Sequence, residues 1–399
     1  MPPSVLKTDL ILGIETSCDE TAAAVLRGPR EILSNVIASQ VPVHRRFGGV
    51  VPEIASRQHI LAIDTVVGDA MTRSGVGMED LGGVAVTFGP GLVGSLLVGL
   101  SVAKSIAMVR GIPLAGVNHH EGHIRSVFIE HPEAPLPMMM LMVSGGDTSL
   151  YLIPAEGTQR ALAHTRDDAA GEAYDKVAKL LGLGYPGGPI IDRLARRGNP
   201  KAVTFSRPRM SDGTLDFSFS GMKTAVLRHV QARGIKPVTV EARMHQERGG
   251  AENKEADDAD SLHTPREREG HGAAGQTRGD GGGGSKPPDP DTSLDISDEI
   301  LDLLASFQDA LVGYLVDQTV KAAREHGARS IGLSGGVACN SRLREMMREA
   351  GQRLHIPVCY PSPILTTDNA AMIASAGYLH LSRGRVADLT LNANPSARL

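Results

Sequence analysis

Strand-like and helix-like segments alternate along most of this 399-residue chain, and no other feature of the sequence limits its fold as strongly. Short apolar runs typical of buried strands occupy residues 10–15, 83–88, 138–143 and 330–333. Such alternation predicts an α/β fold with mixed sheets. Further strands are expected at 21–26, 113–117, 148–153 and 357–360, and helices at 51–71, from 92, at 119–129, 169–181, 190–196, 221–232, 297–326, from 340 and at 368–382.

One pattern occurs twice along the chain. A buried strand runs into Ser-Gly-Gly at residues 144–146 and again at 334–336, and a strand–turn–strand unit opens each half. The repetition predicts two related lobes with a cleft between them.

Residues 241–292 interrupt this pattern. Met244 and Leu262 are the only large apolar residues in the segment, which also contains four consecutive glycines. Because such a composition cannot bury enough surface to offset its ordering entropy, we interpret the segment as a disordered insertion, a solvated linker rather than a docking tail. It carries 12 acidic and 7 basic residues, whereas the other 347 residues carry 33 and 34, so the net charge of −4 does not exclude a nucleic-acid partner.

Cysteine content and hydropathy exclude several classes of protein. Cys18, Cys339 and Cys359 are too few and too widely spaced for a disulfide framework or a Cys-x-x-Cys zinc site, and they indicate a reducing compartment. No apolar run reaches the roughly 18–20 residues of a membrane span, and we find no signal or transit peptide. We therefore expect a cytoplasmic protein with no membrane partner. With no Trp, six Tyr and seven Phe, binding of single strands by aromatic stacking is not expected.

Residues 118–123 read Asn-His-His-Glu-Gly-His directly after an expected buried strand. His119 and His123 are four residues apart, so on a helix their imidazoles share one face, a spacing that metal ligands use. A pair of surface or capping histidines is the alternative, but the position after a buried strand favours a metal site. Asp368, at the expected start of the last helix, is the candidate third ligand, and an N-cap role is its default interpretation.

The histidine motif differs from that of a zinc protease. In His-Glu-x-x-His the glutamate directly follows the first histidine and reaches the metal-bound water. Here Glu121 lies two residues after His119, about 200° further around the helix, so it points away from the metal face. A metalloprotease is therefore a poor fit to this spacing.

Glycine-rich turns follow three of the expected strands, at residues 89–91, 144–146 and 334–336. Backbone N–H groups exposed in such turns cradle phosphates, and together with the run at 184–189 they suggest a nucleotide cleft. Neither the P-loop nor the dinucleotide fingerprint occurs. Asp175, one turn into an expected helix, is a candidate to bind a ribose or another hydroxyl.

Several ordered motifs resemble the tRNA adenosine threonylcarbamoyltransferase family, TsaD, formerly called Gcp. They extend from about residue 10 to 377 and comprise 13–21 (GIETSCDET), 48–53 (GGVVPE), 119–123 (HHEGH), 144–146 (SGG), 187–189 (GGP), 217–224 (FSFSGMKT), 334–340 (SGGVACN) and 367–370 (TDNA). The resemblance implies an actin-like (ASKHA) fold of two lobes with mixed sheets and an interlobe cleft. The first lobe is expected to comprise residues 1–124 and 368–399, and the second 125–367, with 241–292 inserted in it.

The resemblance also implies an acyltransferase. It would move the threonylcarbamoyl group from threonylcarbamoyl-adenylate to the exocyclic amine of adenosine 37 in tRNAs that read codons beginning with adenine, releasing AMP. His119, His123 and Asp368 would bind one metal ion per subunit, expected to be Fe²⁺, with Zn²⁺ possible. The adenylate would be held by Met142, Val143, Ser144, Gly145, Gly146, Asp175, Gly188, Asp192 and Asn340. Since bacterial relatives work with TsaB and TsaE, these proteins are the implied partners besides tRNA.

Two residues depart from the family pattern. Asp147 follows the first Ser-Gly-Gly where the family commonly has His, which changes the charge beside the adenylate site, and Phe47 stands where Tyr is usual. Residues 44–46 (His-Arg-Arg) and Arg57 are candidate contacts to tRNA phosphates. The alternatives are a metal-dependent endopeptidase, an older label of the family, and a non-catalytic ASKHA subunit.

Overall fold

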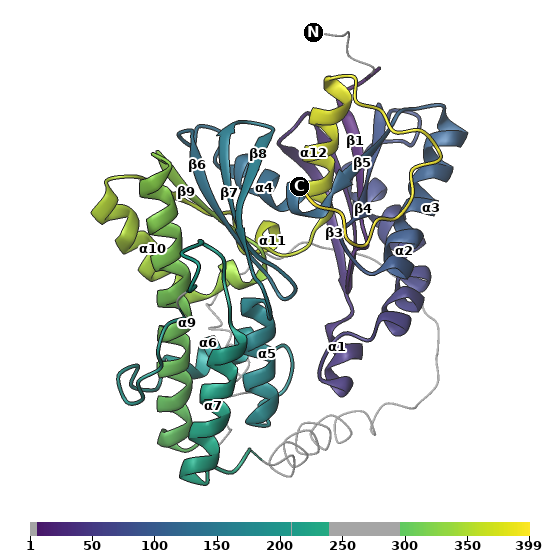
Figure 1. The fold of residues 1–399 in the computed structure, drawn as a ribbon. Helices are drawn as coiled ribbons and strands as arrows, with labels where there is room; N and C mark the ends of the chain where they lie inside the picture. Colours follow the sequence, from purple (N-terminus) through teal and green to yellow (C-terminus); the bar gives the residue numbers. More distant parts are fainter. Residues whose placement is uncertain (1–5, 209, 239–295) are drawn as a thin grey trace, which may run out of the picture. The chain divides into compact units, whose positions relative to one another are not determined.

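A computed structural model of the protein describes residues 6–208, 210–238 and 296–399. The interpretation of residues 241–292 as a disordered insertion lies outside the described residues. The chain divides into one compact unit of residues 1–236 and 298–399 and a second unit of residues 237–297. All of the elements named below belong to the first unit (Figure 1).

The first sheet has the strand order β3-β2-β1-β4-β5. The β1–β2 and β2–β3 pairs are antiparallel, and the β1–β4 and β4–β5 pairs are parallel. Its strands are β1 (Leu10–Glu15), β2 (Glu20–Arg27), β3 (Glu31–Ser39), β4 (Gly83–Gly89) and β5 (Leu114–Asn118). The helices near it are α1 (Val41–His44), η1 (Arg45–Phe47), α2 (Pro52–Ser74), α3 (Val93–Arg110) and α12 (Ala370–Ser382).

The second sheet has the order β8-β7-β6-β9-β10, so it repeats the topology of the first sheet strand for strand. Here too the β6–β7 and β7–β8 pairs are antiparallel, and the β6–β9 and β9–β10 pairs are parallel. The strands are β6 (Met138–Val143), β7 (Thr148–Ala155), β8 (Thr158–His164), β9 (Ser330–Ser334) and β10 (Val358–Cys359). The prediction of two related lobes in an α/β fold is therefore confirmed.

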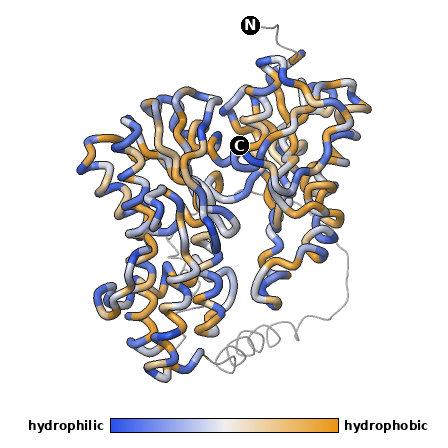
Figure 2. The backbone as a smooth tube through the Cα atoms, viewed as in Figure 1, coloured by the Kyte–Doolittle hydropathy of each residue, from blue (hydrophilic) through white to orange (hydrophobic). Residues whose placement is uncertain are grey.

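The helices of the second lobe are α5 (Ala170–Leu180), α6 (Gly187–Ala195), α7 (Ser220–Arg233), α9 (Asp298–Glu325), η2 (Gly336–Cys339), α10 (Ser341–Leu354) and α11 (Pro363–Thr366). Hydrophobic and hydrophilic segments alternate along α9 (Figure 2). Residues 303–308 and 310–316 are nevertheless all buried, so the middle of the helix is enclosed on nearly every side. Its buried residues include Leu304, Phe307 and Leu311.

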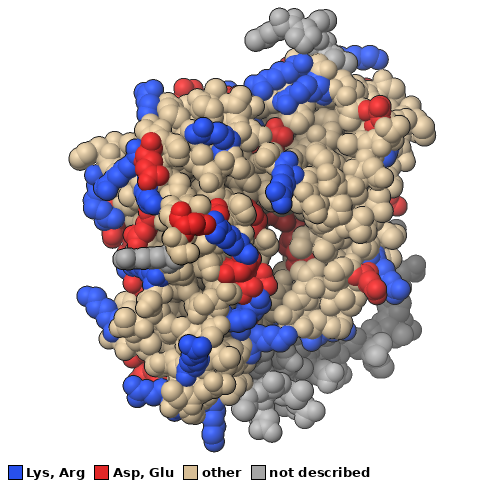
Figure 3. Space-filling view, in the orientation of Figure 1, with Lys and Arg blue, Asp and Glu red and all other residues tan. Residues whose placement is uncertain are grey.

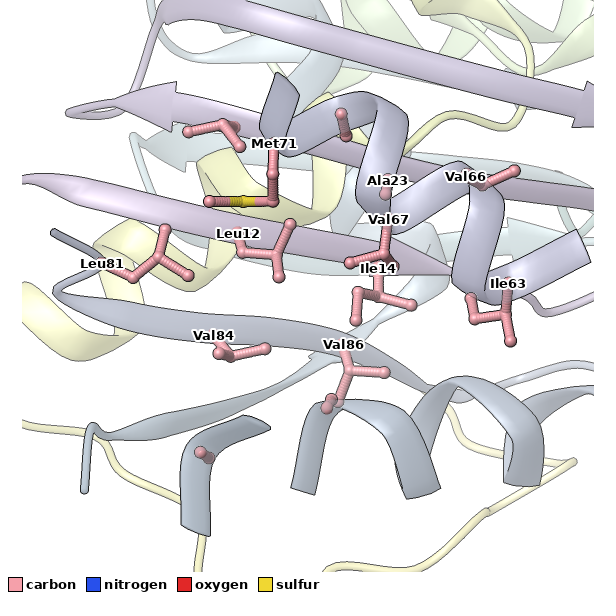
Figure 4. Packing of buried hydrophobic residues seen from close by; sticks show 14 of the residues in the cluster. Leu12, Ile14, Ala23, Ile63, Val66, Val67, Met71, Leu81, Val84 and Val86 are labelled. Carbon is pink, nitrogen blue, oxygen red and sulfur yellow. The ribbon is translucent and has the colours of Figure 1, made fainter. Parts of the chain in front are cut away.

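Period-two alternation along β1 divides the first core between the two faces of its sheet. Leu12 and Ile14 pack with Ile63 and Val67 of α2 (Figure 4), and the same cluster includes Leu100 of α3. The intervening residues face α12, which approaches closely, because a Cβ on Gly13 would lie 2.4 Å from the carbonyl oxygen of Ala370. Helix α12 thus packs directly against the first sheet, which holds the loop before α12 close to that sheet.

Helix α4 (His119–Glu130) joins the two halves of the core. It begins directly after β5, and its apolar residues Ile124, Val127 and Phe128 pack against the second sheet at Met138 and Met140. The hydroxyl of Ser126 lies 3.0 Å from that of Ser334 at the end of β9. The N-terminus of α4 therefore lies where the first sheet ends and close to the carboxyl end of the second.

Most of the expected elements occur within one to three residues of their expected bounds, but β3 and β8 were not predicted. Both are edge strands with largely exposed or half-buried residues, so they lack the apolar run that marks a buried strand. Among the described helices α3 is long and apolar enough to cross a membrane by length and composition, contrary to our expectation of no such segment. One face of α3 is buried, with Leu96, Leu100 and Ala103 in the core, and 33% of the helix is buried.

Candidate active site

The side chains of His119, His123 and Asp368 converge as the sequence predicted. One ligand atom from each lies within 4.8 Å of the others. Asp368 Oδ1 is 3.1 Å from His123 Nε2 and 3.5 Å from His119 Nε2. The two imidazole rings pack edge to face, with their centroids 4.7 Å apart. Two imidazoles and a carboxylate are a donor set that suits Fe²⁺ or Zn²⁺, so these residues fit the metal that the family resemblance implies.

Local capping explains why these three side chains are free to converge. Asn118 caps α4, because its side chain accepts a hydrogen bond from the backbone N–H of His120, so the histidines are not used as caps. The default N-cap role of Asp368 is wrong: Asn369 caps α12 by accepting from the N–H of Met372. The carboxylate of Asp368 is thereby left to face the histidines across 245 residues of sequence.

Glu121 points away from this cluster, as its position on the helix predicted. Its Oε1 lies 2.8 Å from His380 Nε2 on α12, and its side chain is buried. Glu121 therefore does not stand where a zinc protease of the His-Glu-x-x-His type holds its general base.

Opposing charges control protonation in the cluster. Burial lowers the pKa of His119, but the carboxylates of Asp368 and Glu15 outweigh burial and raise it to about 9. Burial raises the pKa of Asp368, yet the charges of His119 and His123 hold it well below its usual range. Without a metal, the site thus holds one imidazolium cation between two carboxylates, a place that a divalent cation can take. Burial, followed by the charges of His119 and His123, lowers the pKa of His120 to about 3.

Glu15 is a site residue to which the sequence analysis gave no separate role. It ends β1, it is fully buried, and its Oε2 lies 3.1 Å from His119 Nδ1. Burial raises the pKa of Glu15, but the charge and hydrogen bond of His119 leave it lowered overall. A lone carboxylate at the end of an apolar strand was the available signal, because burying an unpaired charge is costly.

The two Ser-Gly-Gly loops lie side by side next to this cluster. Gly335, with φ of 90°, packs against the backbone of Val143, where a Cβ would lie 2.5 Å from the carbonyl oxygen. Met142 and Val143 end β6 with buried side chains, whereas Gly145 and Gly146 are exposed and leave open space above them.

Asp147 closes the first of these loops. Its backbone N–H donates to Ser144 Oγ, and its Oδ1 accepts from the hydroxyl of Ser149. Its Oδ2 is buried, and no hydrogen-bond partner for it occurs among the described residues. Burial raises the pKa of Asp147, while the charges of His123 and His119 oppose this rise. The departure from the family pattern thus adds an acidic group beside the histidines.

Asp175 and Gly188 lie where α5 meets α6. Asp175 Oδ1 accepts a hydrogen bond of 2.6 Å from the N–H of Gly187, and Gly188 has no atom within 4 Å of the position of a Cβ. Burial raises the pKa of Asp175 to about 6, and the charge of Asp19 from the first lobe adds to it. In Figure 3 the surface is hollowed near its centre, and acidic side chains are seen in the hollow.

Asp192 and Asn340 are already engaged with protein groups. Asp192 Oδ1 accepts from Ser341 Oγ at 2.8 Å and from Gln308 Nε2 at 3.2 Å. Asn340 caps α10 with its Oδ1 and donates from Nδ2 to Gln308 Oε1 at 2.8 Å. Gln308, a polar residue in the buried stripe of α9 that we did not single out, therefore links two predicted donor-site residues. Their direct contact with a donor stays a prediction.

The cysteines and the candidate phosphate contacts fall into two groups. Burial raises the pKa of the Cys18 and Cys339 thiols, which fits packing residues rather than nucleophiles. Arg45, Arg46 and Arg57 are exposed. His44, in contrast, is buried against Gln40 and accepts from the N–H of Val51, so it is unsuited to a phosphate contact.

Comparison with known proteins agrees with this arrangement. Residues 31–375 match the family described as TsaD, tRNA N6-adenosine threonylcarbamoyltransferase. Proteins of that name from Clostridium perfringens and Symbiobacterium thermophilum are 45% and 46% identical over 390 and 394 residues, which is 98% and 99% of this chain and 98% of each relative.

Solved structures at low identity support the fold alone. HypF from T. kodakarensis superposes with a TM-score of 0.55 at 14% identity, over 97% of this chain and 49% of that protein. A full-length HypF in its phosphate- and nucleotide-bound form superposes with a TM-score of 0.51 at 13% identity, over 96% of this chain and 47% of that protein. The two-lobed, actin-like (ASKHA) fold is therefore shared with proteins of distant sequence.

Proposed function

The chain belongs to the tRNA N6-adenosine threonylcarbamoyltransferase family, and from this we propose that it transfers a threonylcarbamoyl group to the exocyclic amine of adenosine 37 in tRNAs that read codons beginning with adenine. We further propose threonylcarbamoyl-adenylate as the donor and AMP as the leaving group. The convergence of His119, His123 and Asp368 beside the exposed glycines of the loop at 144–146 carries this proposal.

An adenylate is a mixed anhydride and is already activated, so the chain needs no covalent nucleophile. This agrees with Cys18 and Cys339, whose pKa values are raised by burial. The work left to the chain is to hold the acyl carbonyl near the attacking amine and to favour the charge that develops there. The open backbone at Gly145 and Gly146 is suited to close approach of the phosphate.

We propose that His119, His123 and Asp368 hold one metal ion, Fe²⁺ or Zn²⁺. When bound, such an ion supplies a positive charge that polarises an acyl group or neutralises a phosphate. The chain's own contribution is to present these ligands. Helix α4 supplies the two imidazoles in their neutral form, and Asp368, the residue before the N-cap of α12, supplies the carboxylate. For this His119 must lose the proton that Asp368 and Glu15 favour in the metal-free site.

The donor is expected to lie along the Ser-Gly-Gly loop at 144–146 and to reach Asp175 and Gly188. Asp192 and Asn340 would then lie below the donor and contact it from that side, and the hydrogen bonds that both make with Gln308 would hold them in position. Because Asp175 is acidic and partly buried, it is suited to accept from a ribose hydroxyl rather than to approach a phosphate.

TsaB and TsaE are the partners that we propose, and an apolar surface on the first lobe supports a protein partner. Ile60 and Leu61 of α2 and Val93 of α3 are 63%, 73% and 54% exposed. We propose that TsaB covers this face. Leu61→Asp is expected to abolish co-elution with TsaB, whereas Val109→Asp, at a position 77% exposed elsewhere on α3, should retain it. Because its substrate is tRNA, we propose the cytoplasm as the location of the protein.

The test uses the full chain with TsaB, TsaE, threonine, bicarbonate, ATP and unmodified tRNA, and measures the modified nucleoside by mass spectrometry. His119→Ala should lose both the bound metal and transfer. His355→Asn is the matched control, because it also removes one imidazole, from an exposed position with φ of 56° that Asn tolerates.

Wild-type transfer by the His119→Ala variant would overturn the site assignment. Absence of the nucleoside, in an assay where a curated relative forms it, would overturn the function. Cleavage of a glycoprotein that is lost with His119→Ala would favour the endopeptidase, and purified protein without stoichiometric metal would favour the non-catalytic subunit.

A further inference from the structure

Glu15 is held in place as an acceptor of hydrogen bonds. Its side chain is 0% exposed at the end of β1. The hydroxyl of Thr87 donates to Oε2 at 2.6 Å, and the backbone N–H of Ser17 donates to Oε1 at 2.5 Å. With both oxygens engaged by donors, the group is an ionised carboxylate that has no hydrogen to offer.

His119 meets this carboxylate through one ring nitrogen only. Its Nδ1 lies 3.1 Å from Glu15 Oε2, whereas its Nε2 lies 3.5 Å from Asp368 Oδ1. Nδ1 also lies 3.2 Å from the hydroxyl of Ser17, which can accept as well as donate. Because Glu15 can only accept, a lone pair on Nδ1 would face the lone pairs of the carboxylate, so Nδ1 carries the hydrogen of their contact. In the neutral imidazole the lone pair is then on Nε2, the atom that faces Asp368 and His123.

His123 has a different second partner. Its Nε2 also faces Asp368, at 3.1 Å, but its Nδ1 lies 3.5 Å from the hydroxyl of Ser334. A hydroxyl can donate or accept, so it does not determine the tautomer of His123 as a carboxylate determines that of His119.

We propose that Glu15 is a positioning residue of the metal centre, which binds His119 through Nδ1–H and thereby presents Nε2 as the metal ligand. The inference rests on the proposed function, because it requires His119 to bind a metal. A carboxylate behind a ligand histidine orients the ring and raises its basicity. Glu15 also provides a second negative charge, so that with Asp368 it balances a divalent cation inside a buried site.

Glu15→Gln is the informative variant, because it preserves the shape of the side chain. The amide oxygen has to accept from the N–H of Ser17, which leaves the amide NH₂ facing Thr87 and His119. The NH₂ then donates to Nδ1, and the hydrogen of the neutral ring moves to Nε2, where it blocks the ligand position. Thr87→Val is the matched control, since it removes another hydrogen bond to the same oxygen but keeps the carboxylate.

The experiment titrates Co²⁺ into the metal-free full chain, follows the d–d absorption, and records the thermal midpoint of each apo variant. Glu15→Gln is expected to weaken Co²⁺ binding by about 10- to 100-fold, and Thr87→Val by no more than about threefold. Equal affinities of Glu15→Gln and wild type, with binding lost in His119→Ala, would overturn the inference and leave the proposed function intact. If the wild type binds no Co²⁺ or Zn²⁺, both the inference and the proposed metal site are wrong.

A measurement on the wild-type chain keeps the inference testable if Glu15→Gln does not fold. In the Zn²⁺-loaded protein, ¹⁵N NMR of the histidine rings, assigned by the signals that His119→Ala removes, should show a hydrogen on Nδ1 and metal on Nε2. Metal on Nδ1 would refute the role of Glu15.

Discussion

Asp175 is expected to lower the stability of the protein at the pH at which it works. Its side chain is half-buried where α5 meets α6, and burial raises its pKa from 3.8 to about 6. The folded state therefore holds this proton more tightly than the unfolded chain, so stability falls as the pH rises from about 4 to about 6. Above pH 7 this difference in pKa of about two units lowers the free energy of unfolding by about 2–3 kcal/mol.

The perturbation is Asp175→Asn, which is neutral at every pH and keeps an oxygen for the N–H of Gly187. At pH 8 the variant should be more stable than the wild type by about 2–3 kcal/mol, and at pH 4.5 the difference should fall to about 1 kcal/mol. Urea unfolding followed by circular dichroism at both pH values measures this. Glu133→Gln, at an exposed position, controls for the loss of one negative charge.

A stability difference that is the same at both pH values would refute the burial argument, as would a less stable variant at pH 8. The same variant should also lose transfer if Asp175 contacts the donor. The two readouts are independent, because the first depends only on the free protein.

Three further predictions concern other parts of the fold. Asp167→Ala should cost about 2–3 kcal/mol of unfolding free energy, because Asp167 accepts four hydrogen bonds from residues 218–220; a loss below about 0.5 kcal/mol in thermal unfolding would contradict this. Glu156→Ala should cost about 3 kcal/mol, since it leaves the fully buried guanidinium of Arg125 without its carboxylate partner; Arg125→Met in the same chain should restore part of the loss. Replacing residues 241–292 with a short linker should leave tRNA modification unchanged, and a folded deletion without transfer would show that the segment has a role.

The sequence alone determined those features that depend on near neighbours. Period-two and apolar runs located the buried strands, and the four-residue spacing placed His119 and His123 on one face of a helix. The same helical geometry turned Glu121 away from them. These features were predictable because backbone periodicity acts within a few residues.

Only the tertiary structure decided which distant groups meet. Asp368 and His123 are 245 residues apart in the sequence. The carboxylate of Asp368 faces the histidines because Asn369, and not Asp368, caps α12, and because α12 packs against the first sheet. Glu15 became recognisable as the partner of His119 only when β1 and β5 were placed in one sheet. The edge strand β3 forms without an apolar run because hydrogen bonds to β2 supply its order. Sequence periodicity assigns each element a face, whereas sheet order and close packing decide which faces are brought together.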